Sequence, residues 1–358
     1  MKLLDRVLQQ VEAGRVPDTM IRMGIRRLLR QRLDSLERDQ PDIIAREEQE
    51  FSAMCSGGAI AEHPELANKQ HYEVPSGFFE AVLGPRLKYS CCYFSCEETT
   101  LADAEESALL ITAHHAGLQD GQQVLELGCG WGSLSLWMAE HYPNSRITAV
   151  SNSASQRIHI EARARERGLT NLSVRTADMN EFTTKDVFDR VVSVEMFEHM
   201  RNHEELLRRI SQWLKPDGRL FVHIFCHRSR SWLFEDRGPD DWMARQFFSG
   251  GMMPALALLP RYQSNLQIVK QWQWSGRHYE QTCNTWLSRL DSAGEEALIE
   301  LTRVYGPEMA PVQLQRWRIF FMSCAELFGF RDGTEWMVTH LLFEPRTADA
   351  APQGDVTQ

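Results

Sequence analysis

The sequence has no run of about 18 apolar residues, the length that a membrane-spanning helix needs. Its first residues, Met1 to Arg6, lead into mixed charged sequence rather than the apolar core of a signal peptide. The eight cysteines include no paired C-x-x-C motifs, which disfavours a zinc site and favours reduced cysteines in packed segments. These absences predict a soluble, cytoplasmic protein without a metal site.

A surplus of basic charge is also missing. Lysine and arginine number 39 against 49 aspartates and glutamates, which gives a formal charge of −10. No global field therefore draws the protein to nucleic acid, which we exclude as a partner, and any basic contact must be local. The 43% hydrophobic content is ordinary for a globular enzyme, and only the tail over 346–358 has a composition typical of disorder.

A locally basic stretch lies near the N-terminus. Apolar residues at helical spacing predict that residues 1–65 form a helical extension, within which Ile21 to Leu33 contains five arginines and no acid. Two interpretations remain open: a solvated helix face above an apolar stripe, and a surface that contacts lipid or an acidic partner. A peripheral membrane contact through this helix and a homodimer are therefore both candidate interactions. The arginines are Arg22, Arg26, Arg27, Arg30 and Arg32.

Beyond Leu101, helical and strand patterns alternate. Helices are predicted over 101–116, 134–141, 156–167 and 203–213. Strands are predicted over 123–127, 146–150, 172–175, 189–194, 219–225, 266–269 and 337–343. This alternation predicts an α/β domain over 66–345, with a mostly parallel, doubly wound sheet covered on both faces. An aromatic- and methionine-rich segment, 234–263, interrupts the pattern and is predicted to be a helical insertion that covers the site.

A glycine-rich loop follows the first predicted strand. In Glu126-Leu127-Gly128-Cys129-Gly130-Trp131-Gly132, the three glycines remove side chains that would block a sharp turn and a close ligand. A dinucleotide fingerprint would read G-x-G-x-x-G, and a P-loop would carry a lysine. The spacing therefore favours S-adenosylmethionine over NAD or ATP. A turn without a ligand is disfavoured because three glycines in five residues cost backbone entropy.

Polar residues follow the next two strands. Asn152 and Gln156 can bond the hydroxyls of a ribose, although Asn152 or Ser153 could equally cap the next helix. Asp178, beside Met179, stands where an acid could accept a hydrogen bond from an adenine amino group, or it could be an ordinary loop aspartate.

An acidic cluster follows the fourth strand, at the end where open α/β sheets bind ligands. Glu198 and His199 stand three and four positions after Glu195, so a helical turn would bring all three to one face. Two carboxylates and an imidazole near a sulfonium favour a cationic amine, whose proton must leave before the nitrogen attacks a methyl group. The alternative is an exposed acidic helix start that the helix dipole favours.

Six segments between about Leu83 and Phe343 resemble the coclaurine N-methyltransferase group of the cyclopropane fatty acid synthase superfamily. The resemblance implies a class I (Rossmann-like) methyltransferase fold, S-adenosylmethionine as cofactor, and a cluster of Glu195, Glu198 and His199 acting on an amine. The segments are Lys88 to Phe94, Glu126 to Gly132, Val194 to Met200, Phe221 to His227, Glu235 to Met243 and Ala325 to Gly329.

Two sets of binding residues are expected from the residues and the resemblance together. Aromatic rings can hold a cation by their π-faces, although core packing is the commoner role for each ring taken singly. Around the cofactor we expect Tyr89, Ser90, Glu126, Gly128, Gly130, Asn152, Gln156, Asp178 and Met179. Around the substrate we expect Phe78, Phe79, His223, Trp242 and Tyr279, with further aromatic cover from Phe247 and Phe248.

Cyclopropane synthases share much of this pattern. The resemblance implies that they hold a bicarbonate base with residues matching Cys91, Glu198, His223 and Tyr279. In those enzymes the residue matching Glu195 is usually glycine, and an isoleucine matches Phe225. A further carboxylate would repel bicarbonate and attract an ammonium group, so methylation of a hydrophobic, aromatic or alkaloid-like amine is preferred. Carbon methylation of a lipid acyl chain, a cofactor-binding protein without catalysis, and an NAD-dependent oxidoreductase are the alternatives.

Overall fold

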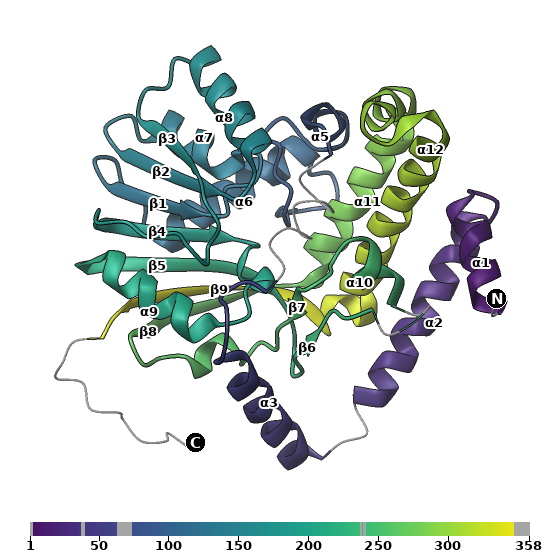
Figure 1. The fold of residues 1–358 in the computed structure, drawn as a ribbon, viewed down its shortest axis with the longest axis horizontal. Helices are drawn as coiled ribbons and strands as arrows, with labels where there is room; N and C mark the ends of the chain where they lie inside the picture. The colour runs from purple at the N-terminus through teal and green to yellow at the C-terminus, as the bar shows by residue number, and fades with distance from the viewer. Residues whose placement is uncertain (1–2, 37–39, 63–73, 237, 239–240, 347–358) are drawn as a thin grey trace.

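One seven-stranded sheet organises the molecule. The computed structural model describes residues 3–36, 40–62, 74–236, 238 and 241–346. The strand order is β3-β2-β1-β4-β5-β9-β8, with β1 to β5 parallel and β9 antiparallel to β5 and β8 (Figure 1). The strands are β1 (Gln123–Leu127), β2 (Arg146–Ser151), β3 (Leu172–Thr176), β4 (Phe188–Val194), β5 (Leu214–His227), β8 (Leu266–Trp274) and β9 (Trp336–Pro345).

The chain winds outward from β1 in both directions, first to β2 and β3, then to β4 and β5. Because parallel crossovers are right-handed, the helices of the two halves cover opposite faces of the sheet. The predicted doubly wound α/β sheet is therefore confirmed. Its helices are α6 (Leu101–Ala116), α7 (Ser133–His141), α8 (Ala154–Glu166) and α9 (His203–Trp213).

The ends of α6 lie where they were predicted. The Thr100 hydroxyl accepts a hydrogen bond from the Asp103 amide at 3.2 Å and so caps the first turn. Gly117 ends the helix in the left-handed conformation (φ 64°), which glycine adopts without steric cost. The edge strand β8 is longer than predicted because residues such as Lys270 and Gln271 alternate between faces, and an apolar run marks only its first half.

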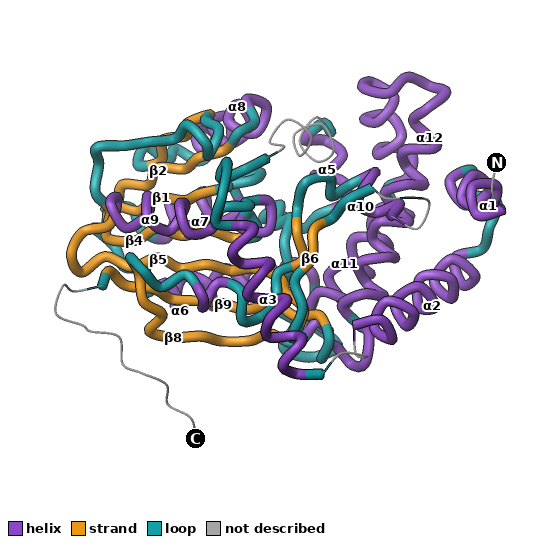
Figure 2. Tube along the Cα trace, turned by 60° about the horizontal axis from the view of Figure 1, so that its bottom comes forward, coloured by secondary structure: helices purple, strands orange, loops and turns teal. Residues whose placement is uncertain are grey.

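A helical layer that the sequence analysis did not identify covers one end of the sheet. It contains α11 (Gly276–Ser292) and α12 (Gly294–Phe328), which pack against α5 (Ser76–Val82). Figure 2 shows this layer to one side of the strands, together with α2 (Asp18–Leu36). Its interior is aromatic: Trp317 lies 5.0 Å from Phe78 and 5.8 Å from Phe79 between ring centroids. This aromatic cluster holds α5 against α12.

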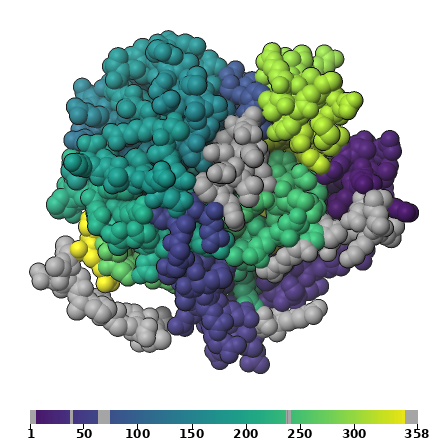
Figure 3. Space-filling model, in the orientation of Figure 1, coloured from purple at the N-terminus to yellow at the C-terminus, as the bar shows by residue number. Residues whose placement is uncertain are grey.

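The N-terminal region contains α1 (Leu3–Glu12), α2 and α3 (Pro41–Cys55), and α2 packs against α12. In Figure 3 the purple start of the chain lies beside the yellow-green atoms of the C-terminal part. Arg22 and Arg26 both donate to the Glu326 carboxylate, at 2.9 and 3.0 Å. A third arginine, Arg32, has its guanidinium 4.7 Å from the centre of the Trp232 ring. Three of the five arginines of this stretch therefore contact other parts of the protein, with Arg26 and Arg32 still exposed to solvent. Lipid contact through this helix stays a prediction. None of the helices in the described part of the chain is long and apolar enough to cross a bilayer.

The segment 234–263 contains α10 (Trp242–Gln246), β7 (Met252–Met253) and the short 3-10 helix η4 (Leu259–Arg261). β7 pairs with β6 (Trp232–Leu233) in a two-stranded ribbon, and the turn before β7 brings Ser249 and Gly250 to the site. The predicted boundary at 65/66 and the predicted tail beyond Arg346 lie outside the described residues.

Candidate active site

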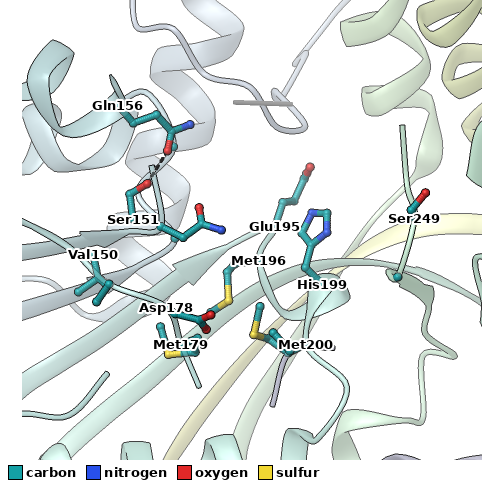
Figure 4. Close-up of a pocket in the computed structure, with 16 residues that line it drawn as sticks. Val150, Ser151, Gln156, Asp178, Met179, Glu195, Met196, His199, Met200 and Ser249 are labelled. Atoms are coloured by element: carbon teal, nitrogen blue, oxygen red, sulfur yellow. Dashed lines mark hydrogen bonds between the residues drawn. The ribbon is translucent and has the colours of Figure 1, made fainter. Parts of the chain in front are cut away.

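A pocket lies at the carboxyl ends of β1, β2 and β4, where the strand order reverses. Such a switch point is where open α/β sheets bind ligands, because the loops on either side of it diverge. Figure 4 shows Glu195 and His199 on one side of this pocket and Ser151 with Gln156 on the other. The predicted site residues that line it are Gly128, Gly130, Asn152, Gln156, Asp178, Met179, Glu195 and His199.

The glycine loop turns tightly over the end of β2. The amides of Gly128 and Cys129 both donate to the Val150 carbonyl, at 2.9 and 3.0 Å. Gly128 has a φ of +78°, and a Cβ there would lie 2.6 Å from Met196. Gly130 is also left-handed, but a Cβ at Gly130 would meet no heavy atom within 4 Å. The loop is therefore packed tightly at Gly128 and open at Gly130, as a loop that supports a ligand must be.

The start of α8 presents polar groups to the pocket. Ser153 is the N-cap and accepts a hydrogen bond from the Gln156 amide at 3.3 Å, so the cap does not fall on Asn152, which lines the pocket. The Ser151 hydroxyl donates to Gln156 Oε1 at 2.6 Å. Gln156 is 1% exposed, yet its Nε2 has no hydrogen-bond partner. Since a buried donor is costly without a partner, this amide fits a polar group of a bound nucleoside.

Asp178 and Met179 follow β3 and line the pocket (Figure 4). Asp178 Oδ1 accepts a hydrogen bond from the Asn180 amide at 2.8 Å, which orients the carboxylate. With the open glycine loop and the unpaired Gln156 amide, this acid completes a set of groups that fits S-adenosylmethionine.

Three predicted cofactor residues are not among those that line the pocket. Glu126 is buried and accepts a hydrogen bond from the Ser135 hydroxyl; burial raises its pKa to about 8. Ser90 accepts a hydrogen bond from Lys88 Nζ at 2.6 Å. The Tyr89 ring packs 5.1 Å from the Phe79 ring.

The Glu195 side chain contacts residues from three other segments of the chain. Its Oε1 accepts a hydrogen bond from the Cys91 amide at 2.8 Å and lies 3.1 Å from His223 Nε2. Its Oε2 accepts a hydrogen bond from the Tyr279 hydroxyl at 2.6 Å. The backbone of Glu195 is left-handed (φ 49°), an uncommon conformation for a residue with a side chain. Such strain persists where its surroundings hold the residue in place, as the three partners do here.

The two glutamates of the cluster differ in how readily they ionise. Burial raises the pKa of Glu195, whereas Lys88 and the Cys91 amide act against this rise. Glu198 is 1% exposed, its Oε2 has no partner, and burial together with the charge of Glu195 raises its pKa well above the usual range. Since two close carboxylates resist ionising together, Glu195 is the carboxyl that ionises first and Glu198 is the one that retains its proton more strongly.

His199 completes the cluster. Its ring stacks on Phe248, with centroids 5.1 Å apart and an angle of 14° between the planes, and it faces the pocket. The 3-10 turn η2 (Phe197–His199) replaces the α-helical turn considered from the sequence. The left-handed backbone at Glu195 then directs the first carboxylate toward Cys91 and Tyr279.

The predicted substrate residues divide into two groups. Tyr279 and His223 contact Glu195 directly. Phe78 and Phe79 are fully buried in the aromatic layer, and Trp242 donates its indole N–H to Glu12 Oε1 at 2.7 Å. These three rings lie in the core behind the site.

Sequence reasoning did not identify Lys88 as a site group, and it named Cys91 only as a match to the bicarbonate site of cyclopropane synthases, without its backbone amide. Lys88 is 2% exposed and donates to Ser90 and to the Cys91 carbonyl, which places a positive charge beneath Glu195. A backbone amide has no sequence signal, but a lysine within an aromatic-rich stretch could have been read as a buried cation with an acidic partner. In the described part of the chain, no group of three or more His, Cys, Asp or Glu side chains is arranged to hold a metal ion.

Comparisons with known proteins identify the family of the chain. The family model for mycolic acid cyclopropane synthetase matches residues 61–336. The chain is 37% identical to (S)-coclaurine N-methyltransferase of Thalictrum flavum subsp. glaucum, over 96% of each protein. It is 28% identical to cyclopropane-fatty-acyl-phospholipid synthase of Escherichia coli (strain K12), over 76% of this chain and 67% of that enzyme.

A solved structure is similar over nearly the whole chain. The crystal structure of coclaurine N-methyltransferase bound to N-methylheliamine and S-adenosylhomocysteine matches with a TM-score of 0.93 at 37% identity. The match covers 96% of this chain and 100% of that one.

Proposed function

Because the chain belongs to the mycolic acid cyclopropane synthetase family and is an S-adenosylmethionine-dependent methyltransferase, we propose that it methylates the nitrogen of a hydrophobic, aromatic or alkaloid-like amine. The family contains enzymes with two kinds of acceptor, an amine nitrogen and the acyl chain of a phospholipid, judging by the names of the relatives. The group that removes the proton from the acceptor distinguishes amine methylation from acyl-chain methylation.

The contacts of Glu195 carry the proposal. The residues that match the bicarbonate site of cyclopropane synthases include Cys91, His223 and Tyr279, and in this chain all three surround the Glu195 carboxylate. A carboxylate and a bicarbonate ion each present a planar pair of negatively charged oxygens. Glu195 therefore takes the place of the ion, and the base becomes part of the protein.

A built-in anion suits an ammonium substrate. A protonated amine brings a positive charge that offsets the cost of keeping Glu195 ionised in a buried site. Burial and the charge of Glu195 raise the pKa of Glu198, which favours its protonated form as a hydrogen-bonding group beside Glu195, and His199 lies against Phe248 at the pocket wall. The three groups hold the amine and receive its proton, which frees the nitrogen lone pair.

Bound S-adenosylmethionine supplies a methyl group on an electron-poor sulfonium. Gly130 gives it space, the tight turn at Gly128 shapes the loop, Asn152 and Gln156 suit its ribose, and Asp178 suits its adenine amino group. Phe225 is 5% exposed and packs 5.8 Å from the Phe248 ring, so an aromatic ring stands where cyclopropane synthases have isoleucine.

We also assign residues 1–65 to a helical extension and residues 234–263 to the cover of the site. The pairing of Arg22 with Glu326 and the approach of Ser249 to the pocket support these assignments.

The test is a screen of amines with isotopically labelled S-adenosylmethionine, reading the product mass and the position of the new methyl group. A methylated amine nitrogen with no change in lipid acyl chains is the expected result. Glu195→Gln and His199→Ala should lower the rate, whereas Glu161→Gln, exposed on α8, is the matched control. Full methylation by the first two variants would refute the base assignment, and bicarbonate-dependent lipid products would refute amine methylation.

A further inference from the structure

Three histidines continue from Glu195 into the sheet. His223 Nε2 lies 3.1 Å from Glu195 Oε1, and His223 Nδ1 lies 2.9 Å from His340 Nε2. His340 Nδ1 in turn lies 2.8 Å from His115 Nδ1. Each imidazole uses one nitrogen toward the site and the other away from it, as far as the half-buried His115. The result is an unbroken hydrogen-bonded path from a buried carboxylate to the face of α6.

The path is built into the sheet register. Val194, which precedes Glu195, pairs with His223, and His223 pairs with His340 across β5 and β9. Both histidines are fully buried, and apolar rings enclose them: Trp274 lies 4.4 Å and Phe221 5.1 Å from His340 between centroids. Such an enclosure excludes water from the path, so protons can move along it only through the imidazoles.

The last histidine is held in place by an aromatic stack. The His115 ring lies 3.9 Å from the Trp272 ring with an angle of 6° between the planes, and Trp272 pairs with His340 across β8 and β9. This stack keeps His115 Nδ1 directed at His340. His114, the next residue back on α6, is exposed and has no place in the path.

We propose that His223, His340 and His115 form a proton relay that carries the proton taken up by Glu195 to solvent at α6. The inference rests on the proposed function, in which Glu195 receives the proton of the amine. Glu195 needs such an exit because its side chain is only 8% exposed and its oxygens are already surrounded by Cys91, Tyr279 and His223.

Each transfer breaks one bond to hydrogen and forms another. The Glu195 O–H bond breaks as a bond forms at His223 Nε2, and the proton on His223 Nδ1 moves to His340 Nε2. The proton on His340 Nδ1 then moves to His115 Nδ1, and His115 releases one from Nε2 to water. No electrons are exchanged. At the end each ring carries its proton on the nitrogen that faces Glu195, which is the tautomer that donates to the ionised carboxylate. The rings must therefore return to the opposite tautomer after Glu195 takes up the next proton.

The electrostatic surroundings suit transfer rather than storage. Burial and Lys88 lower the pKa of His223, and burial with the neighbouring histidines and Lys88 lowers that of His340. Burial, His114 and Lys270 lower the pKa of His115 to about 4. All three imidazoles are therefore neutral at physiological pH, and none of them traps the proton as an imidazolium.

The first arm of the test follows protons during one turnover. Enzyme, S-adenosylmethionine and an accepted amine are mixed in weak buffer with a pH indicator, and methyl transfer is measured in parallel by rapid quench. In the wild type, the proton should appear in solution together with methyl transfer. In His115→Phe, which retains a ring against Trp272, this burst should be lost and proton release should follow product dissociation. His114→Phe is the matched control and should retain the burst. An unchanged burst in His115→Phe would overturn the relay.

The second arm needs no methyl acceptor, so it separates the relay from the proposed function. In protein labelled with ¹⁵N-histidine, exchange of the His223 and His340 ring N–H protons with D₂O is followed by NMR. His115→Phe should slow this exchange by about 100-fold, the lower end of what a positioned proton-transfer group supplies. His114→Phe should not slow it. Equal exchange in both variants refutes the relay, whereas wild-type protein that methylates no amine refutes the proposed function alone.

Discussion

The two halves of the site are built in different ways. The cofactor half comes from consecutive segments, the glycine loop after β1, the start of α8 and the loop after β3. The acceptor half is assembled from distant segments: the partners of Glu195 are separated from it by 104 residues (Cys91), 84 residues (Tyr279) and 28 residues (His223). The first half depends on backbone shape and the second on a balance of buried charges. Substitutions should therefore affect the two halves separately.

The largest effect is expected from removing the charge of Glu195. Glu195→Gln keeps the size of the side chain but cannot take up the proton of the amine, so kcat/KM for the amine should fall by about 100-fold or more. Because burial raises the pKa of Glu195, the acid limb of the wild-type pH–rate profile should lie above the usual carboxyl range.

Calorimetric titration with S-adenosylhomocysteine provides the control for this variant. Its affinity should equal that of the wild type if the halves act separately. If Glu195→Gln retained the wild-type rate, or if its affinity for the cofactor fell as much as its rate, the two halves of the site would not act separately.

A smaller effect in the other half is expected from Gly128→Ala. The added methyl group would lie 2.6 Å from Met196 at a φ of +78°, so the loop must shift and cofactor affinity should fall by about tenfold. Gly121→Ala is the matched control, since Gly121 is also left-handed (φ +87°) but a Cβ there meets nothing within 4 Å. It should lose some thermal stability and no affinity. Equal affinity losses in both variants would mean that backbone strain alone is responsible.

The smallest effect concerns Glu126, which begins the glycine loop but is buried against Ser135. Burial raises its pKa from 4.5 to about 8, so the folded state retains a proton that the unfolded state releases. Its contribution to stability is thus fully present below pH 4.5 and is lost as the pH rises through 8. Glu126→Gln cannot ionise, so in denaturant unfolding its stability relative to the wild type should increase over this range. Parallel curves would show that Glu126 ionises normally.

The same contrast explains what could be predicted. The strand–helix alternation, the bounds of α6, and the pocket position of Gly128, Asn152 and Asp178 follow from local patterns, because each depends on a few consecutive residues. The cofactor and the fold could be predicted from the sequence for this reason. Glu195 could be named because it directly follows a predicted strand.

What surrounds Glu195 could not be predicted in the same way. Contact with the Cys91 amide requires the left-handed backbone at Glu195. A glutamate in the sequence does not predict this conformation. His340 lies within an apolar strand, and only the register between β5 and β9 brings it to His223. The helix α12 was missed because its apolar residues lie on all sides of the helix rather than on one face. Pro307 and Pro311 also fall within it, and proline normally argues against a helix interior.

The central claim, that Glu195 takes the place of a bicarbonate base, is tested most directly by Glu195→Gly. Glycine adopts the left-handed backbone of this position without strain and vacates the space between Cys91, His223 and Tyr279. Methylation of an accepted amine is measured with and without added bicarbonate, beside the wild type and Glu195→Gln. The account predicts that bicarbonate restores activity to Glu195→Gly alone. A wild type that depends on bicarbonate, or a glycine variant that ignores it, would contradict the account.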